Sequence, residues 1–215
     1  GRVDFWLCAG RISTGEVLSL SEEEKLRLTA QSVELTHSLD PETPILASFD
    51  QPWAEFMGRH DVDFPPLHVA DVLVRANLGL TGLMLEIPMG FFPGGSLLRD
   101  RIEISRQLDH WSTLGMPLYI SLCTPSSSTP DPLAQQRSKV LHAGSSPQTQ
   151  QAWINRIVPM LLAKPYVHGI VWNQLRDYEP HDYPHAGLFD LRRHPKPGLR
   201  TLASLRQAHL AKRGG

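Results

Sequence analysis

Several features that define other protein classes are scarce in this chain of 215 residues. It has only two cysteines, too few for a disulfide framework, and both Cys8 and Cys123 lie in apolar stretches typical of buried small side chains. The formal net charge is only −1, so there is no electrostatic reason to expect nucleic acid or an acidic membrane surface as a partner. No apolar run approaches the roughly 20 residues that span a bilayer.

The usual cofactor and metal motifs are also missing. None of the ten histidines has the spacing of a metal site, and the nearest pair, His181 and His185, is predicted to make loop hydrogen bonds. The glycine-rich run from Gly90 to Gly95 matches neither a P-loop nor a dinucleotide fingerprint, and predicts a rim loop. Ser126 to Ser128 lie in no nucleophile elbow, which disfavours serine hydrolysis. We therefore expect no metal and no cofactor.

The start of the chain leaves its localisation open. The segment from Gly1 to Trp6 lacks the apolar region and cleavage site of a secretory signal. It begins with Gly rather than Met, however, which is compatible with earlier removal of a signal.

Short apolar runs alternate with longer amphipathic segments, a pattern typical of β/α units around a parallel sheet. The runs are nearly continuous in apolar residues, as expected for strands that are covered on both faces. Five strands are predicted: Val3 to Ala9, Ile45 to Phe49, Leu80 to Ile87, Leu118 to Cys123 and Val167 to Leu175.

The segments between and after these strands predict helices. Ser21 and Glu24 form a capping box that begins the first one, Gly79 and Gly115 are expected to end the second and third, and Pro159 is expected to bend the fourth. The predicted helices run from about Glu22 to Leu39, Leu67 to Leu78, Leu98 to Leu114, Gln148 to Ala163 and Gly198 to Ala211.

The chain is predicted to be a single domain over residues 1–215. Residues 124–147 are rich in Ser, Pro and Thr without apolar periodicity, which predicts a long rim loop rather than a linker between domains.

The last fifty residues carry the most specific pattern. The strand from Val167 to Leu175 leads to Asp177, then to Gly187-Leu-Phe-Asp190 and to Lys196-Pro197 at the start of the closing helix. This resembles the close of glycoside hydrolase family 10, the xylanase family, with its V-x-G-I-x-x-W-G-x-x-D strand, G-L-x-D turn and K-P-A helix start. Gly198 replaces the alanine.

The resemblance implies an α/β fold, a partial (β/α)8 TIM barrel made of the last five β/α units. Five units do not close a barrel that needs eight. The missing N-terminal units of the same protein are then expected to precede Gly1.

The resemblance also locates the family's two catalytic glutamates, and both are replaced. Leu114-Gly-Met-Pro-Leu-Tyr-Ile-Ser-Leu-Cys123 is similar to L-G-x-P-I-x-I-T-E-L-D, which puts Leu122 at the nucleophile. Val3 to Arg11 is similar to the strand ending W-D-V-V-N-E, which puts Arg11 at the acid/base. Neither side chain can do that chemistry.

Other carboxylates stand at predicted strand ends. Asp50 and Glu55 flank the turn after the second strand, and Glu86 ends the third. They are candidates for a relocated catalytic pair, since glycosidases work with two carboxylates at such ends. Asp50 as a turn cap and Glu55 as a solvated loop residue are the structural alternatives, and a buried Glu86 would need a partner such as Arg75 or Arg99.

Aromatic and amide side chains near the same ends suggest a sugar-binding site. The candidates are Trp53, Trp172, Asn173, Gln174 and Asp177. Tryptophans such as Trp53 and Trp172 are more often core or rim packing than sugar platforms, unless the loop exposes them. A loop-fixing hydrogen bond to the turn from Tyr178 to His185 explains Asp177 equally well.

Two functions follow, both with carbohydrate as the partner. In the first, the chain belongs to a glycoside hydrolase that cleaves a β-linked polysaccharide with relocated carboxylates. In the second, it is a pseudoenzyme that binds a glycan without cleaving it.

Overall fold

The computed structural model describes residues 3–14, 20–59, 62–135, 139–140 and 142–213. The chain divides into two units. The first comprises residues 1–87 and 106–120, and the second comprises residues 88–105 and 121–215.

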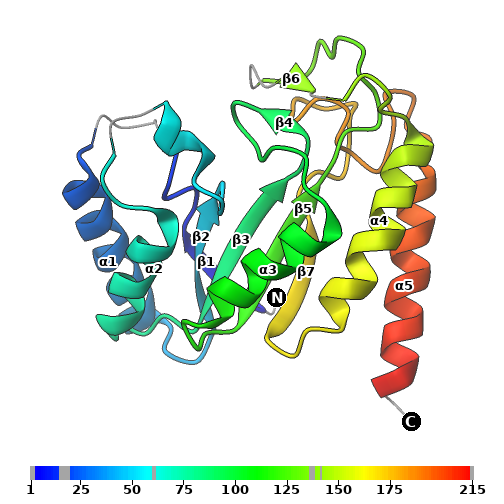
Figure 1. The fold of residues 1–215 in the computed structure, drawn as a ribbon. Helices are drawn as coiled ribbons and strands as arrows, with labels where there is room; N and C mark the ends of the chain where they lie inside the picture. Colours follow the sequence, from blue (N-terminus) through cyan, green and yellow to red (C-terminus); the bar gives the residue numbers. More distant parts are fainter. Residues whose placement is uncertain (1–2, 15–19, 60–61, 136–138, 141, 214–215) are drawn as a thin grey trace. The chain divides into compact units, whose positions relative to one another are not determined.

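One sheet of five strands organises the chain, in the order β1-β2-β3-β5-β7. β1 pairs in parallel with β2, and β2 with β3. The strands are β1 (Trp6–Ala9), β2 (Ile45–Asp50), β3 (Gly82–Pro88), β5 (Leu118–Cys123) and β7 (Val167–Trp172). All five coincide with predicted strands, and helices separate them along the sequence (Figure 1).

In the first unit, α1 (Glu22–Leu39) begins with the predicted capping box. The Ser21 hydroxyl accepts from the Glu24 amide at 3.2 Å, and the Glu24 carboxylate accepts from the Ser21 amide at 2.9 Å. The short helix η1 (Glu55–Gly58) follows β2, and α2 (Pro66–Arg75) has proline at its first position, where no amide hydrogen is needed.

The core of the first unit lies around β2 and β3, which are buried along their whole lengths. Side chains of a strand alternate between faces, so Phe49 points opposite to Ser48 and Asp50. Phe49 packs on Trp111 of α3 (Arg101–Ser112), with ring centroids 5.3 Å apart. Ser48 and Asp50 therefore lie on the other face, away from this helix.

In the second unit, α4 (Pro147–Leu162) and α5 (Pro197–Arg213) lie side by side (Figure 1). The strands β4 (Phe91–Phe92) and β6 (Lys139–Val140) form a short antiparallel ribbon. A buried cluster of Phe91, Cys123, Tyr183 and Ala186 lies beneath it.

The element ends differ from the sequence prediction by a few residues. α2 ends at Arg75 rather than Leu78, because the chain already turns through a left-handed Asn77 before Gly79, whose φ is +102°. β7 ends at Trp172 rather than Leu175.

The ribbon of β4 and β6 was not predicted. It pairs the glycine-rich segment with part of the predicted rim loop 124–147, of which residues 136–138 and 141 lie outside the described residues. Among the described residues, no helix is long and apolar enough to cross a membrane.

Candidate functional site

The carboxyl ends of β2 and β3 bring two predicted site residues together in the first unit. Asp50 and Glu86 are register partners on these neighbouring parallel strands, and both are buried. Paired residues of a parallel ladder point to the same face, so both carboxylates lie on the face opposite Phe49 and α3.

Glu86 is held by two neighbours. The Ser48 hydroxyl donates to its Oε1 at 2.5 Å, and Nε of Arg11 lies 3.6 Å from its Oε2. Arg11 adopts a left-handed conformation with φ of 50°, uncommon for a residue other than glycine. The partner of Glu86 is thus Arg11, and the prediction of Arg75 or Arg99 was wrong: Arg75 pairs with Asp71, and Arg99 with Glu103.

Burial raises the pKa of Glu86, and the negative charge of Asp50 raises it further. The hydrogen bond from Ser48 and the charge of Arg11 oppose this rise, but they do not cancel it. A carboxyl group with a raised pKa keeps its proton to higher pH, which is the property that a general acid needs.

Asp50 accepts hydrogen bonds from the loop after β1. Its Oδ1 accepts from the amides of Ser13 and Thr14 at 3.1 and 3.3 Å, and its Oδ2 accepts from the Thr14 hydroxyl. These bonds fix the segment after Arg11, so Asp50 orders a loop as well as lying beside Glu86.

The turn after β2 is anchored by α3. The carbonyl of Pro52 accepts from the side chains of Gln107 and Trp111, so the position of the neighbouring Trp53 depends on this helix. Trp53 and Glu55 are half-buried, and Glu55 begins η1.

The other four predicted residues lie in the second unit, at the end of β7 and in the segment that follows it. Gln174 and Asp177 are buried, Trp172 is half-buried and Asn173 is exposed. The sugar-binding role suggested for these residues by the sequence stays a prediction.

Asp177 and Gln174 are engaged inside the protein. Asp177 Oδ1 accepts from Gln174 Nε2 at 3.0 Å and from the Gly187 amide at 2.7 Å, and Asp177 Oδ2 pairs with Lys196. Gln174 also accepts from the Tyr183 amide at 3.1 Å. These contacts favour the alternative in which Asp177 fixes a loop, although its partners are Gly187 and Lys196.

Lys196 connects three segments of this unit. Besides Asp177, its ammonium group donates to the Ser126 hydroxyl at 2.6 Å and to the His185 carbonyl at 3.2 Å. Burial lowers the pKa of Lys196, and the negative charge of Asp177 only partly offsets this. The sequence marked Lys196 only as part of the closing motif, since nothing local reveals these partners.

The two histidines singled out from the sequence share one carboxylate. His181 Nε2 lies 3.0 Å from Asp131 Oδ2, which also accepts from the His185 amide at 2.8 Å. Burial alone would raise the pKa of Asp131, but the amides of His185 and Leu133 and the charge of His185 lower it overall. The prediction of loop hydrogen bonds for this pair is confirmed.

The side chains of the remaining two candidates, Trp172 and Asn173, also make contacts inside the protein. Trp172 donates from its indole to the Ala186 carbonyl at 3.0 Å and meets Trp153 edge to face, with ring centroids 6.4 Å apart. Asn173 donates to the Ser121 hydroxyl at 3.2 Å. Among the described residues, no group of three or more His, Cys, Asp and Glu side chains has the geometry of a metal site.

Comparison with solved structures defines the class of fold. Xylanase 10B from Thermotoga maritima superposes with a TM-score of 0.66 at 15% identity, over 99% of this chain and 63% of that one. A thermostable mutant of the xylanase Xyn10A from Cellvibrio japonicus gives 0.63 at 13% identity, over 94% and 65%. A β-glucuronidase from Faecalibacterium prausnitzii gives 0.55 at 18% identity, over 89% and 29%.

These likenesses confirm the predicted fold: an α/β, partial TIM barrel of the kind found in family 10 xylanases. The chain spans slightly less than two thirds of the length of the xylanases that it matches. No protein-family model matches the sequence, and a search of curated proteins finds no significant match.

Proposed function

We propose that this chain is part of a carbohydrate-directed, glycoside-hydrolase-like barrel in which Glu86 acts as the general acid. The single observation that carries the proposal is the buried carboxyl of Glu86, whose pKa is raised, at the carboxyl end of β3. In TIM-barrel enzymes the reacting groups lie at the carboxyl ends of the strands. The likeness to glycoside hydrolase structures supports a carbohydrate substrate.

In this proposal Glu86 gives its proton to the glycosidic oxygen as the bond to the anomeric carbon breaks. Ser48 orients the carboxyl group, and Arg11 stabilises the carboxylate that remains after the transfer. Asp50 or Glu55 supplies the second carboxylate, which attacks the anomeric carbon directly or activates the water that does so. The proposed substrate is a β-linked polysaccharide.

In the first unit, Trp53 is proposed to offer an aromatic surface to a sugar. In the second unit, Trp172 and Asn173 at the end of β7 are proposed as sugar contacts, and Gln174 and Asp177 are proposed to hold the adjoining loop through their mutual hydrogen bond. Because the chain spans about two thirds of the xylanases, the complete site requires further β/α units. We place these units before Gly1 in the same protein, and residues 1–215 form one portion of a single barrel domain.

A second candidate function, binding of a glycan without cleavage, rests on how fully these carboxylates are engaged. Asp50 is occupied by the Ser13 and Thr14 amides and the Thr14 hydroxyl, and Glu86 is paired with Arg11. In this second function, Asp50 and Glu86 keep these contacts and stabilise the loops of a binding surface, and neither carboxylate takes part in a reaction.

The test is hydrolysis of xylan and mixed-linkage β-glucan by the complete gene product, compared with Glu86→Gln. Loss of a general acid costs about 10²- to 10⁴-fold in rate. Glu103→Gln is the matched control, because Glu103 lies on α3, pairs with Arg99 before that helix, and has a half-exposed side chain; its rate should stay within about twofold of wild type.

Affinity electrophoresis in the same polysaccharides separates the two functions. Binding without hydrolysis, equal in wild type and Glu86→Gln, would establish the non-catalytic function. Failure both to bind and to hydrolyse would reject both.

A further inference from the structure

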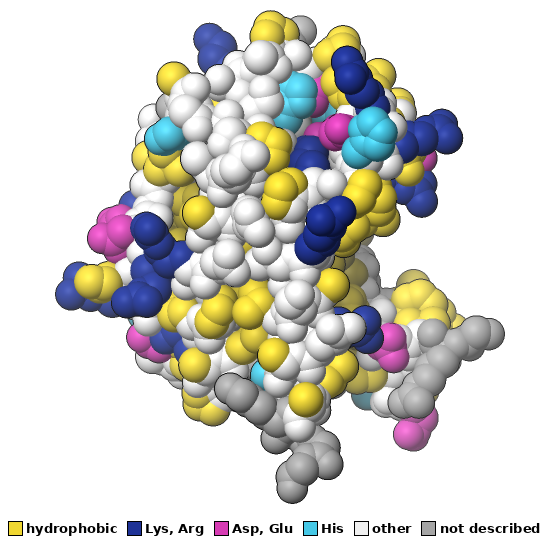
Figure 2. Space-filling model, turned by 90° about the vertical axis from the view of Figure 1, so that its right-hand side faces the viewer, with side chains coloured by type: hydrophobic (Ala, Val, Ile, Leu, Met, Phe, Trp, Pro, Cys, Tyr) yellow, Lys and Arg dark blue, Asp and Glu magenta, His cyan; other side chains and the backbone are white. Residues whose placement is uncertain are grey.

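Charge is unevenly distributed along the chain. Residues 191–215 contain seven Arg and Lys residues and no Asp or Glu, so the net charge of −1 conceals a basic C-terminal segment. This segment forms α5 and the turn that leads into it. Figure 2, which faces α5, shows several Lys, Arg and His side chains in its upper part, the end at which α5 begins (Figure 1). Local positive charge attracts anions even where the whole chain is nearly neutral.

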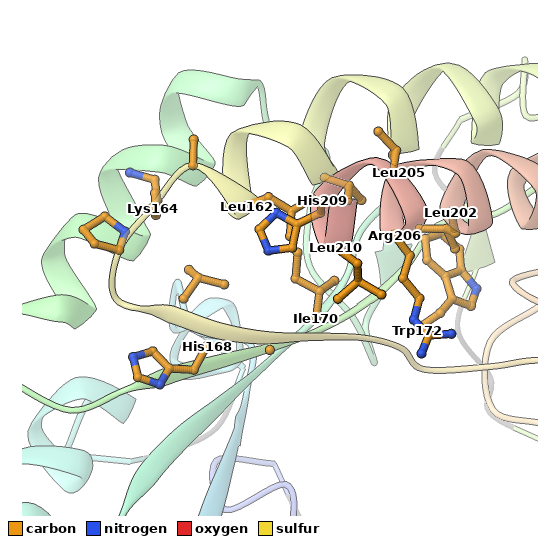
Figure 3. A pocket seen from close by; sticks show the side chains of 15 residues that line it. Leu162, Lys164, His168, Ile170, Trp172, Leu202, Leu205, Arg206, His209 and Leu210 are labelled. Carbon is orange, nitrogen blue, oxygen red and sulfur yellow. The ribbon is translucent and has the colours of Figure 1, made fainter. Parts of the chain in front are cut away.

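The basic residues of this segment border two different cavities. In one, Arg206 and His209 lie among apolar side chains such as Ile170 and Leu210, in a groove of about 450 Å³ along β7 (Figure 3). Apolar walls offer few partners to the hydroxyl groups of a sugar, which are costly to bury without hydrogen bonds. The second cavity, at the start of α5, is polar and suits a sugar better.

The polar pocket has a volume of about 700 Å³, within the usual range for small-ligand sites. It lies in the second unit, where the loops after β5 and β7 meet the N-terminal ends of α4 and α5. Ser127 and Ser145 are half-buried in its wall, and the exposed Gln148 lies at its edge on α4. These side chains offer hydroxyl and amide groups to a ligand.

The charged side chains of the pocket leave one cation in excess. Its two carboxylates are engaged, because Asp177 pairs with Lys196 and Asp190 lies 3.5 Å from His194 Nδ1. The Arg192 side chain is exposed and makes no ion pair with any described residue. An anion that enters the pocket therefore meets a guanidinium group whose charge is not already matched.

The first turn of α4 adds to this positive charge. Pro147 has no amide hydrogen, so the amide of Gln148 is the first donor of the helix, and it has no partner within the helix. The N-terminal end of a helix favours a negative charge nearby. The pocket thus combines this helix end with the side chain of Arg192.

We propose that this pocket is a subsite for the carboxylate of an acidic sugar, a uronic acid carried by the polysaccharide. Arg192 binds the carboxylate, since a planar guanidinium group matches two carboxylate oxygens. Ser127, Ser145 and Gln148 bind the hydroxyl groups of the sugar ring. This inference rests on the carbohydrate part of the proposed function and narrows the substrate class to an acidic polysaccharide. It does not depend on the chemistry at Glu86.

The lining of the pocket favours a sugar over a nucleic acid. Proteins bind single-stranded nucleic acid by stacking its bases on aromatic side chains. Among the described residues that line the pocket there is no Phe, Tyr or Trp. A uronic acid needs only the hydrogen-bonding groups and the single arginine that this pocket has.

Affinity electrophoresis of the complete gene product tests the inference with two forms of one polymer. The first is xylan that carries glucuronic acid, and the second is the same polymer after reduction of its carboxyl groups to alcohols. Wild type should bind the acidic form about 5-fold more tightly, as expected for one well-formed charge pair. Arg192→Gln should bind both forms equally and keep the wild-type affinity for the reduced form.

Arg200→Gln is the matched control for this experiment. It removes the same charge from an exposed position of α5 outside the pocket, so it should keep the preference for the acidic form. Both arginines are exposed, so both variants are expected to fold, and far-ultraviolet circular dichroism checks this. Equal loss of the preference in the two variants would show that total charge controls binding and would overturn the pocket assignment.

The remaining outcomes separate this inference from the proposed function. Equal binding of the two polymer forms by wild type would overturn the inference and leave the proposed function standing, whereas binding of neither form would reject both. Binding of single-stranded DNA as tightly as the acidic polymer would also overturn the inference, because it would identify an unspecific surface for polyanions. In Glu86→Gln the preference for the acidic form should persist even where hydrolysis is lost.

Discussion

At the scale of single residues, the carboxyl group of Glu86 makes the free energy of unfolding depend on pH. Its pKa is raised above the ordinary 4.5 by burial, so between pH 4.5 and its folded value the folded protein keeps a proton that the unfolded chain releases. The free energy of unfolding should therefore fall as pH rises through this window. Glu86→Gln should lack this part of the dependence.

Urea unfolding of wild type and Glu86→Gln from pH 4.5 upward measures the effect. The difference in stability between the two proteins should shift in favour of the variant as pH rises. Parallel stability curves would contradict the raised pKa.

Lys196 and Asp177 form a buried ion pair, with side chains 6% and 1% exposed. Lys196→Met should cost about 3–5 kcal/mol of unfolding free energy, because it leaves the Asp177 charge buried without its partner. Adding Asp177→Asn to this variant should recover part of the loss, since no charge is then stranded. Chemical denaturation of both single variants and the double variant forms the cycle, and simple additivity would contradict a direct interaction.

At the scale of elements, the first turn of α1 offers a clean test of capping. Ser21→Ala removes the acceptor for the Glu24 amide and should cost about 1 kcal/mol of unfolding free energy. Ser32→Ala is the matched control within the same helix, because Ser32 bonds only back to the Leu28 carbonyl and alanine favours helix. Thermal unfolding should show a lower melting temperature for the first variant alone; equal melting temperatures would contradict the capping role.

The strands and most helix starts were predictable because their information is local. Short apolar runs predicted all five strands, and the Ser21 capping box predicted the start of α1 to the residue. The ribbon of β4 and β6 was missed because its two-residue strands are too short to show a period, and they pair across almost fifty positions.

The sequence predicted the carboxylates of the candidate site, but it did not predict the side chains that contact them. Strand ends identified Asp50 and Glu86, which do lie side by side. The role of Arg11 was not visible, because a left-handed arginine depends on the loop that Asp50 holds. Ser48 was hidden inside an apolar run, where its hydroxyl finds Glu86 only across the sheet.

At the scale of the whole molecule, the low net charge and an exposed strand at the edge of the sheet both lower solubility. The chain has a net charge of −1 at pH 7, and on β1 at one end of the sheet order Leu7 is 44% exposed. Low net charge and an apolar edge strand both promote association. Leu7→Lys should therefore raise the soluble concentration of residues 1–215 near pH 7.

Leu35→Lys is the control for this prediction, because Leu35 is 61% exposed but lies on α1 rather than on a strand. Polyethylene glycol precipitation midpoints measure both variants. An equal gain from the two would show that added charge alone, and not protection of the edge, controls solubility.

The ammonium group of Lys196 can also serve as a chemical probe of loop opening. Amine-reactive reagents attack the neutral, accessible amine, and here that nitrogen is enclosed by Asp177, Ser126 and the carbonyl of His185. Acetylation at Lys196, read by mass spectrometry, would thus record each opening of the segments that meet at this nitrogen. The rate of acetylation at Lys196 would therefore measure how often the loops after β5 and β7 open.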